Sequence, residues 1–228
     1  MSLTLLYWDC RGRGQPLRDF FLDRAIEFDD EQLESTEGNP GWPALKADAA
    51  KTGPFGTLPV LRDGARMIVE TEVIIHYLQQ KFGPVRNLED PRDLRDAMAQ
   101  SAAAETRSWA LAAVRGSAAA AATLTWASEK YRRLDAFVPH EQPYFGGEAP
   151  SFADYYAMEA VVDLKHVCGE QAGLFLAELP KLDALYERVR QRPGLAAGWS
   201  ARPERLSGLV SEPAVLADLA TVDWSSCW

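Results

Sequence analysis

Apolar residues in the first third of the chain are spaced in two ways, each typical of one kind of secondary structure. Short apolar runs indicate strands, whereas apolar residues three to four positions apart indicate an amphipathic helix. Strands are expected at residues 3–7, 26–28, 56–61 and 67–69, and helices at residues 15–25 and 71–82. The pair Asp63-Gly64 predicts a tight hairpin turn between the last two strands. The expected order is β-α-β, a Gly- and Pro-rich connection with one candidate helix, and β-β-α.

Beyond residue 90 the pattern becomes almost entirely helical. Alternating β-branched residues give way to long segments rich in Ala, Leu and Arg, which favour helices. Helices are expected over residues 91–115, 117–137, 151–167 and 180–190. Ser151 and Asp154 have the spacing of a capping box, in which each side chain accepts a hydrogen bond from the other residue's amide. We therefore expect an α/β domain over residues 1–82, a linker over residues 83–90, and an all-helical domain with a C-terminal tail over residues 91–228.

Composition and charge argue against several classes of function. The formal net charge of -9 disfavours nucleic acid as a partner, since phosphate binding needs a basic surface. The three histidines lack metal-ligand spacing, so no metal site is expected. The three cysteines, an odd number without CxxC spacing, indicate a reducing compartment. Because the sequence shows no membrane span and no signal peptide, we expect a soluble cytoplasmic protein.

One proline lies where a central strand normally excludes it. Pro59 stands inside the run GTLPVL, and a proline has no backbone N–H to donate to the ladder. The β-α-β unit with a following hairpin and helix is the thioredoxin-like order, in which this strand begins with a cis proline. A cis bond there would turn the backbone of Leu58 out of the ladder and towards a peptide-like ligand. Leu58 and Pro59 are therefore predicted to belong to a binding site.

Four motifs in sequence order resemble the cytosolic glutathione transferases, over about residues 3–200. LLYWDCRGRGQPLR is similar to the first strand and helix of the tyrosine-type classes (alpha, mu, pi and sigma). GTLPVL is similar to their cis-proline strand, ETEVIIHYL to the helix that holds the γ-glutamyl end of glutathione, and SFADY to the capping box of a core helix. The resemblance implies the fold of that family, a thioredoxin-like α/β domain followed by an all-α domain, with glutathione as co-substrate.

The resemblance gives roles to residues around the expected glutathione site. Tyr7 is similar to the catalytic tyrosine, whose hydroxyl donates to the glutathione sulfur and favours the thiolate; without the resemblance it is a core residue that ends a strand. The backbone of Leu58 would pair with the cysteinyl part. Thr71 matches a serine that holds the γ-glutamyl carboxylate at a helix N-terminus, or is only an N-cap. Glu70 replaces the glutamine usual in these classes and resembles serine- and cysteine-type relatives, and its carboxylate would accept from the α-ammonium.

Four further residues are expected near glutathione on the same resemblance. Trp42 and Lys46 are spaced like the tryptophan and lysine that hold the glycyl carboxylate in mu-like proteins. Arg13 is another candidate for that carboxylate, or else a surface residue. Glu105 lies on the first expected helix of the second domain, from which an acid in the family reaches the glutathione of the neighbouring subunit. The family also implies a homodimer.

Cys10 makes a second chemistry possible. It follows Tyr7 closely, near the catalytic position of the serine- and cysteine-type classes, and neighbouring arginines at a helix N-terminus lower the pKa of a thiol. Cys10 is therefore either a reactive thiol or a small apolar residue in the pocket for the electrophile. That pocket is expected at the domain boundary, with candidates Trp8, Cys10, Trp109 and Arg115. Trp224 and Trp228 in the tail either cover this pocket or pack on the helices.

The resemblance implies an enzyme that stabilises the glutathione thiolate with Tyr7. The thiolate would be conjugated to an apolar electrophile, as in detoxification, or used for an isomerisation. A first alternative is a glutathione-dependent thiol transferase based on Cys10, which would form mixed disulfides. A second is a non-catalytic binding module, because a fold alone does not establish a reaction.

Overall fold

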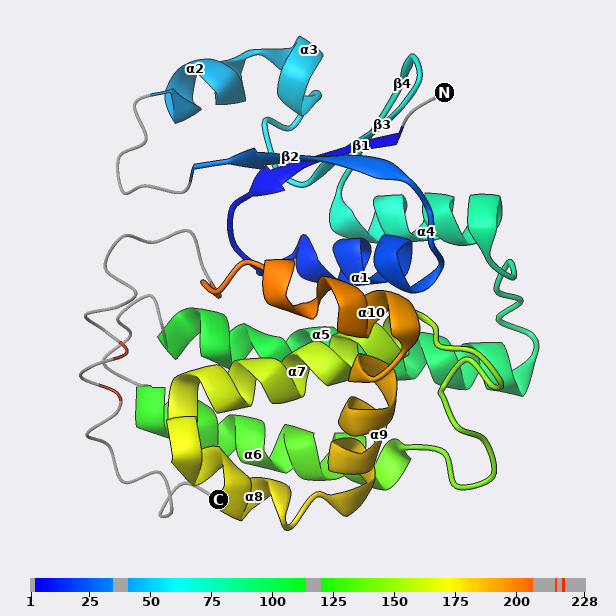
Figure 1. Ribbon diagram of the computed structural model, residues 1–228, viewed down its shortest axis with the longest axis vertical. Helices are drawn as coiled ribbons and strands as arrows, with labels where there is room; N and C mark the ends of the chain where they lie inside the picture. The colour runs from blue at the N-terminus through cyan, green and yellow to red at the C-terminus, as the bar shows by residue number, and fades with distance from the viewer. Residues whose placement is uncertain (1–2, 35–40, 114–119, 207–215, 217–218, 220–228) are drawn as a thin grey trace.

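The computed structural model describes residues 3–34, 41–113, 120–206, 216 and 219, which form an α/β domain above a helical domain (Figure 1). The strands of the α/β domain are β1 (Leu3–Trp8), β2 (Phe28–Leu33), β3 (Val60–Asp63) and β4 (Arg66–Val69). They form one mixed sheet in the order β2-β1-β3-β4, with β1 and β2 parallel and the other pairs antiparallel. The thioredoxin-like arrangement is confirmed, with two short helices, residues 42–47 and 49–52, where one was expected before β3. Strand β3 covers Val60–Asp63, whereas a strand was expected at residues 56–61.

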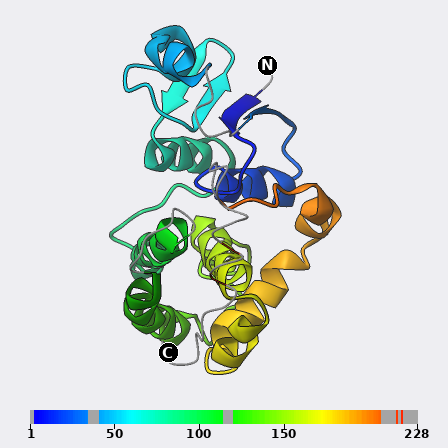
Figure 2. The ribbon, with the colours of Figure 1, turned by 90° about the vertical axis from the view of Figure 1, so that its left-hand side faces the viewer.

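Helices cover both faces of this sheet. The α/β domain contains α1 (Gln15–Asp23), α2 (Trp42–Ala47), α3 (Ala49–Thr52) and α4 (Thr71–Phe82). Figures 1 and 2 show α1 and α4 on the face towards the helical domain, and α2 and α3 on the opposite face. Most of the apolar residues of α1 are buried between the sheet and the helical domain, which explains their helical spacing in the sequence.

The second strand is longer and more polar than its sequence indicated. We expected a strand at residues 26–28, but β2 covers Phe28–Leu33, with sequence FDDEQL. Each of its residues pairs with one of β1 in parallel register, from Leu3 with Phe28 to Trp8 with Leu33. Because β2 is an edge strand, its backbone pairs on one side only and none of its residues is fully buried. Its apolar pattern is therefore weak.

The helical domain is built around a central, almost fully buried helix. Its elements are α5 (Pro91–Ala113), α6 (Ala120–Phe137), α7 (Phe152–Cys168), η1 (Gly169–Gln171), α8 (Ala172–Leu176), α9 (Pro180–Arg190), α10 (Pro193–Gly198) and η2 (Trp199–Ala201). Helix α7 lies in the core of the domain, and the expected capping box of Ser151 and Asp154 is present at its N-terminus. No helix within the described ranges is long and apolar enough to cross a membrane.

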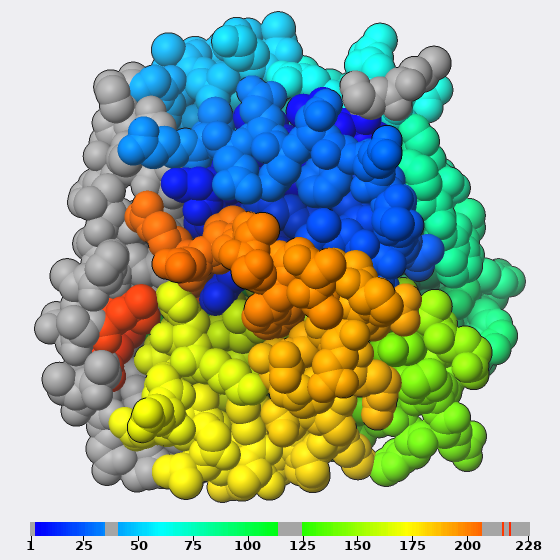
Figure 3. All heavy atoms as spheres, in the orientation of Figure 1, coloured from blue at the N-terminus to red at the C-terminus, as the bar shows by residue number. Residues whose placement is uncertain are grey.

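The chain returns to the α/β domain near its described end. Helix α10 lies beside α1, and the segment from α10 to Leu206 covers the junction between the two domains. In the space-filling view this orange segment lies over the blue first helix and the yellow helices of the second domain (Figure 3). The loop after β1 is thus contacted by residues that lie almost two hundred positions later in the sequence.

Candidate functional site

Tyr7 lies near the end of β1, with its phenol ring enclosed by the loop that follows. Its hydroxyl oxygen accepts a hydrogen bond from the backbone N–H of Arg13 at 2.9 Å. A side chain at Gly12 or Gly14 would collide with the ring: a Cβ at Gly12 would lie 2.6 Å from the Tyr7 Oη, and one at Gly14 2.4 Å from Cδ1. Gly12 also has a φ of +34°, which L side chains disfavour. The glycines of the RGRG run are therefore needed to wrap the phenol.

The surroundings of Tyr7 keep its hydroxyl protonated. Burial raises the pKa of Tyr7 to about 12, and Cys10 adds to the rise, while the Arg13 amide opposes it. At neutral pH the group is a phenol and not a phenolate. Because the Arg13 N–H donates to the oxygen, the phenol's own proton remains available to an incoming acceptor. An anion such as a thiolate is the kind of group that this hydroxyl favours.

A second group of predicted residues lies at the start of β3 and the start of α4. The peptide bond between Leu58 and Pro59 is cis, and the paired register of β3 begins only at Val60. Glu70 has a φ of +67°, and its carboxylate accepts from the hydroxyl of Thr57 at 3.1 Å. The loop before β3 and the start of α4 are thus joined by a side-chain hydrogen bond.

Thr71 begins α4 with a hydroxyl that lacks a partner. The residue is 8% exposed, and its Oγ1 makes no hydrogen bond within the described chain. A buried polar group without a partner costs about 1–3 kcal/mol, so such groups are expected to have a function or a missing ligand. The N-terminus of α4 adds free backbone N–H groups, which favour an anion. The start of α4 is therefore suited to bind a carboxylate.

Replacing Thr71 by valine is expected to weaken glutathione binding. The change keeps the shape but removes the unpartnered hydroxyl, so KM for glutathione should rise about tenfold, with kcat changed less than about twofold. Thr71→Ser is the matched control, because it retains the hydroxyl. The measurement is steady-state kinetics with glutathione varied, and an unchanged KM in Thr71→Val would contradict a role in binding.

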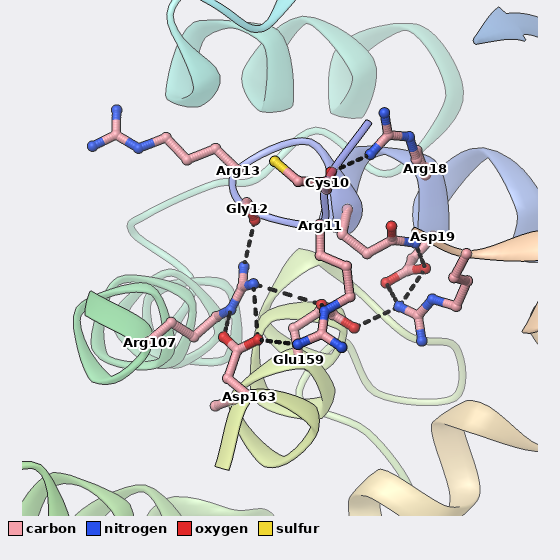
Figure 4. Close-up of polar contacts among 12 residues, drawn as sticks. Cys10, Arg11, Gly12, Arg13, Arg18, Asp19, Arg107, Glu159 and Asp163 are labelled. Atoms are coloured by element: carbon pink, nitrogen blue, oxygen red, sulfur yellow. Dashed lines mark hydrogen bonds and ion pairs between the residues drawn. The ribbon is translucent and has the colours of Figure 1, made fainter. Parts of the chain in front are cut away.

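Trp8 and Trp42 are brought together by the fold. Their rings are 4.9 Å apart between centroids and meet at 65°, edge to face. Lys46, on the same helix as Trp42, is exposed. Arg13 is also exposed, and Figure 4 shows its side chain extending away from the charged side chains of Arg107 and Asp163. Trp8 therefore packs against Trp42, the first residue of α2.

The residues expected around the electrophile and at the second subunit lie in different surroundings. Trp109 is 0% exposed, and its indole N–H donates to the Tyr131 hydroxyl at 3.2 Å inside the helical domain. The prediction that Trp109 lines a pocket therefore does not hold, because its ring is part of the core. Glu105 is exposed and forms an ion pair with Lys130 at 3.0 Å. Arg115 lies outside the described residues, as do Trp224 and Trp228 of the tail.

Cys10 lies beneath the surface close to Tyr7. The residue is only 2% exposed, and its carbonyl oxygen accepts from Arg18 Nη1 at 2.9 Å. A mixed disulfide with glutathione needs an accessible sulfur, so this geometry favours the small apolar role over the reactive thiol. Among the residues that the structure describes, no cluster of His, Cys, Asp and Glu is arranged to hold a metal ion.

A buried group of charges, which no motif in the sequence indicated, lies where the two domains meet. This interdomain ion cluster consists of Arg11, Asp19, Arg107, Glu159, Asp163 and Arg202 (Figure 4). Its arginines come from the loop after β1, from α5 and from the segment after η2, and its acids from α1 and α7. Burial raises the pKa of Asp19 to about 7, although Arg202 opposes the rise. The only signal in the sequence is the pair Glu159 and Asp163, one turn apart in an otherwise apolar helix.

Comparisons with protein families match both domains to one family. The model of the glutathione S-transferase N-terminal domain matches residues 30–86, and that of the glutathione S-transferase C-terminal domain matches residues 117–200. Hematopoietic prostaglandin D synthase of Gallus gallus is 27% identical over 211 residues, which cover 89% of this chain and 98% of the relative. Glutathione S-transferase 2 of Onchocerca volvulus is 25% identical over 209 residues, 86% of this chain and 90% of the relative.

Solved structures show the same fold. A structure of rat hPGDS complexed with a quinoline has a TM-score of 0.72 and 21% identity, and covers 91% of this chain and 100% of its own. The Pi-class glutathione S-transferase of Onchocerca volvulus also has a TM-score of 0.72, with 22% identity, over 89% of this chain and 94% of its own. Because the two domain models come from one family and together match more than half of the chain, the chain belongs to the glutathione S-transferase family, which uses glutathione as a substrate.

Proposed function

We propose that this enzyme activates glutathione by donating the Tyr7 hydroxyl proton, as a hydrogen bond, to the glutathione sulfur. The observation that supports this most directly is the buried phenol at the end of β1, whose oxygen accepts the Arg13 N–H at 2.9 Å. Its raised pKa makes it a donor at neutral pH, so it stabilises a thiolate and does not itself remove the proton. The thiol proton passes to solvent, and the thiolate remains beside Tyr7.

The bound thiolate then reacts with a second substrate. We infer an apolar electrophile, to which the sulfur adds directly in a conjugation, or an isomerisation in which glutathione is regenerated. Both reactions use the same stabilised thiolate and need no further protein nucleophile, since the protein gains rate by holding the reactants together. The names of the relatives include both a glutathione S-transferase and a prostaglandin D synthase, so the family offers either reaction.

The glutathione molecule is proposed to lie along the edge between β3 and α4. Its γ-glutamyl carboxylate would bind the Thr71 hydroxyl and the first amides of α4, and its ammonium would bind Glu70. The Leu58 backbone, which precedes the paired part of β3, would bond the cysteinyl part by strand addition. For the glycyl carboxylate we propose Trp42, Lys46 and Arg13. In this pose the cysteinyl sulfur lies towards Tyr7.

A thiol transferase based on Cys10 remains the second candidate, and one experiment separates the two. The native protein, Tyr7→Phe and Cys10→Ala are assayed with glutathione and a small apolar electrophile. The mass of each protein is then measured by mass spectrometry after incubation with oxidised glutathione. The proposal expects Cys10→Ala to keep its conjugating activity and the native protein to gain no glutathione adduct. An adduct that disappears in Cys10→Ala would support the thiol transferase instead. Glutathione binding without either signal would indicate a binding module.

We also propose a homodimer across the face formed by α4 and α5. Four large apolar side chains are exposed there and in the loop before β3: Phe55, Val73, Leu94 and Met98. Phe55 is 63% exposed, which is unusual for a phenylalanine. Gln100 of α5 donates to Glu72 of α4 at 2.9 Å, so the two helices form one continuous surface. Exposed apolar patches of this kind are typical of protein interfaces.

Phe55→Ser with Met98→Glu is expected to convert the dimer to a monomer. Both changes put polar atoms into a surface that the dimer would bury, and a buried unpaired charge is costly. The measurement is sedimentation velocity of the native and the changed protein at the same concentration. A native protein that sediments as a monomer would refute the dimer. Leu174→Glu, an exposed apolar residue on α8, is the matched control and should leave the dimer intact.

A further inference from the structure

A single peptide unit in the loop after β1 is hydrogen-bonded at both ends. At one end, the N–H of Arg13 donates to the Tyr7 hydroxyl at 2.9 Å. At the other end, the carbonyl oxygen of Gly12 accepts from Nη1 of Arg107 at 3.1 Å (Figure 4). Gly12 C=O and Arg13 N–H belong to the same planar group and point in opposite directions. The guanidinium of Arg107 is thus connected to the catalytic phenol through one peptide bond.

Arg107 is held in place from the opposite side by α7. Its Nε donates to Asp163 Oδ2 at 2.6 Å and its Nη2 lies 3.5 Å from Oδ1, so the fork of the guanidinium faces the carboxylate. Nη2 is also 3.5 Å from the carboxylate of Glu159. The Arg107 side chain is 4% exposed, and those of both acids are fully buried. A buried guanidinium with these partners has a single orientation, and its remaining nitrogen is directed at the Gly12 oxygen.

Two physical effects follow from this contact. Because the peptide is planar, fixing its carbonyl towards Arg107 fixes its N–H towards Tyr7. A cation that donates to the carbonyl also polarises the peptide, which makes its N–H a stronger donor, since hydrogen bonds in a chain strengthen one another. A stronger N–H on the phenol oxygen stabilises negative charge there. The phenol's own proton then becomes a better hydrogen-bond donor to a sulfur anion.

We propose that Arg107, oriented by Asp163, is a positioning residue that aims and polarises the Gly12–Arg13 peptide so that the Tyr7 hydroxyl donates to the glutathione sulfur. The inference rests on the proposed function of Tyr7 and extends it across the domain boundary. Tyr7 and the peptide belong to the α/β domain, whereas Arg107 and Asp163 belong to the helical domain. The helical domain therefore contributes to thiol activation.

The loop has other anchors, so loss of Arg107 should not release it. The Gly12 N–H donates to the Leu206 carbonyl at 3.0 Å, and the Arg11 N–H donates to the Arg205 carbonyl at 2.8 Å. These bonds hold the preceding peptides of the loop without touching the Gly12 carbonyl. Removing Arg107 should therefore leave glutathione binding largely intact and change mainly the direction and strength of the Arg13 N–H.

The test uses a double variant, Arg107→Met with Asp163→Leu, which removes both members of the Arg107–Asp163 pair together. Arg11, which also pairs with Asp163 at 3.1 Å, keeps Glu159 at 3.8 Å. Replacing a buried ion pair by apolar residues is often close to neutral for stability. The measurement is the pKa of the thiol of bound glutathione, from the ultraviolet absorbance of the thiolate. We expect the pKa of the bound thiol to rise by about one unit, so that the thiolate fraction at a pH below this pKa falls about tenfold. KM for glutathione should change less than about twofold. Arg107→Lys, which keeps a charge without the fork, should give an intermediate value.

Arg192→Met is the control for a merely structural effect. Arg192 also forms an ion pair between the two parts of the chain, with the buried Asp23 of α1, but it makes no contact with the loop around Tyr7. The Arg192→Met variant should have a lower unfolding temperature and an unchanged pKa of the bound thiol. If the double variant also leaves the thiol pKa unchanged while Tyr7→Phe raises it, the inference is overturned and the proposed function stands. If Tyr7→Phe has no effect on the thiol pKa either, both the inference about Arg107 and the proposed function of Tyr7 are refuted.

Discussion

Replacing Tyr7 by phenylalanine should lower kcat/KM for conjugation about a hundredfold, the usual effect of removing one preorganised donor to a developing or stable anion. The ring would stay in its enclosure, because Gly12 and Gly14 lie against the ring as well as the hydroxyl. The Arg13 N–H would lose its acceptor, but the loop would keep its bonds to the segment ending at Leu206. The measurement is steady-state kinetics with an apolar electrophile at saturating glutathione.

Two comparisons make this result specific. KM for glutathione should change little in Tyr7→Phe, since the contacts proposed for the tripeptide lie mainly at the start of α4 and along the backbone before β3. Thermal unfolding should also be close to that of the native protein. A large loss of stability with the loss of rate would show that the hydroxyl has a structural role, and an unchanged rate would refute the mechanism.

Asp154→Ala is expected to lower the free energy of unfolding by about 3–5 kcal/mol, the range seen when a buried hydrogen-bonded group leaves several partners unpaired. The fully buried Asp154 carboxylate accepts backbone N–H groups from Phe145 and Ser151, both at 2.9 Å, and from Gly146 at 3.4 Å. It thus begins α7 and fixes the loop before it. Because α7 is the centre of the helical domain, the loss should affect the whole molecule.

Urea unfolding followed by tryptophan fluorescence measures this loss. Ser151→Ala is the matched control: it removes the other half of the capping box and should cost about 1 kcal/mol, the usual value of an N-cap side chain. If Asp154→Ala costs no more than Ser151→Ala, the amides of the preceding loop do not depend on the carboxylate. The folded fraction of either variant should still activate glutathione, since Asp154 makes no contact with Tyr7.

Elements with local signals were predicted closely from the sequence. Helices α4 and α9 cover residues 71–82 and 180–190, as their apolar spacing indicated, and the capping box at Ser151 is present. In each case the residues that define the element lie within one or two turns of each other. Strand β2 was misplaced because its stability comes from pairing with β1, which its own sequence does not encode.

The same distinction separates the predicted site residues. Tyr7 lies near the end of β1 and Thr71 at the start of α4, positions that the local sequence defines, and their roles stay predictions. Trp109 was misplaced because a helix has several faces, and its partner Tyr131 lies on another helix. Which face is buried depends on how α5 and α6 pack, and a single sequence does not show that.

The interdomain ion cluster illustrates what spacing alone leaves out. Glu159 and Asp163 stand one turn apart in a mostly buried helix, so both need buried partners. Their partners Arg11, Arg107 and Arg202 come from three separate segments, so no spacing in the sequence joins them. The connection of Arg107 to Tyr7 exists because the fold packs the two domains against each other.

The most direct test of the mechanism is a pH titration of the ultraviolet absorbance of glutathione bound to the native protein and to Tyr7→Phe. Free glutathione has the pKa of an ordinary thiol, about 8.5. Native protein should lower the pKa of the bound thiol by at least one unit, and Tyr7→Phe should return it to about the free value. A bound thiol whose pKa is the same in both proteins would contradict the central claim that the Tyr7 hydroxyl stabilises the thiolate.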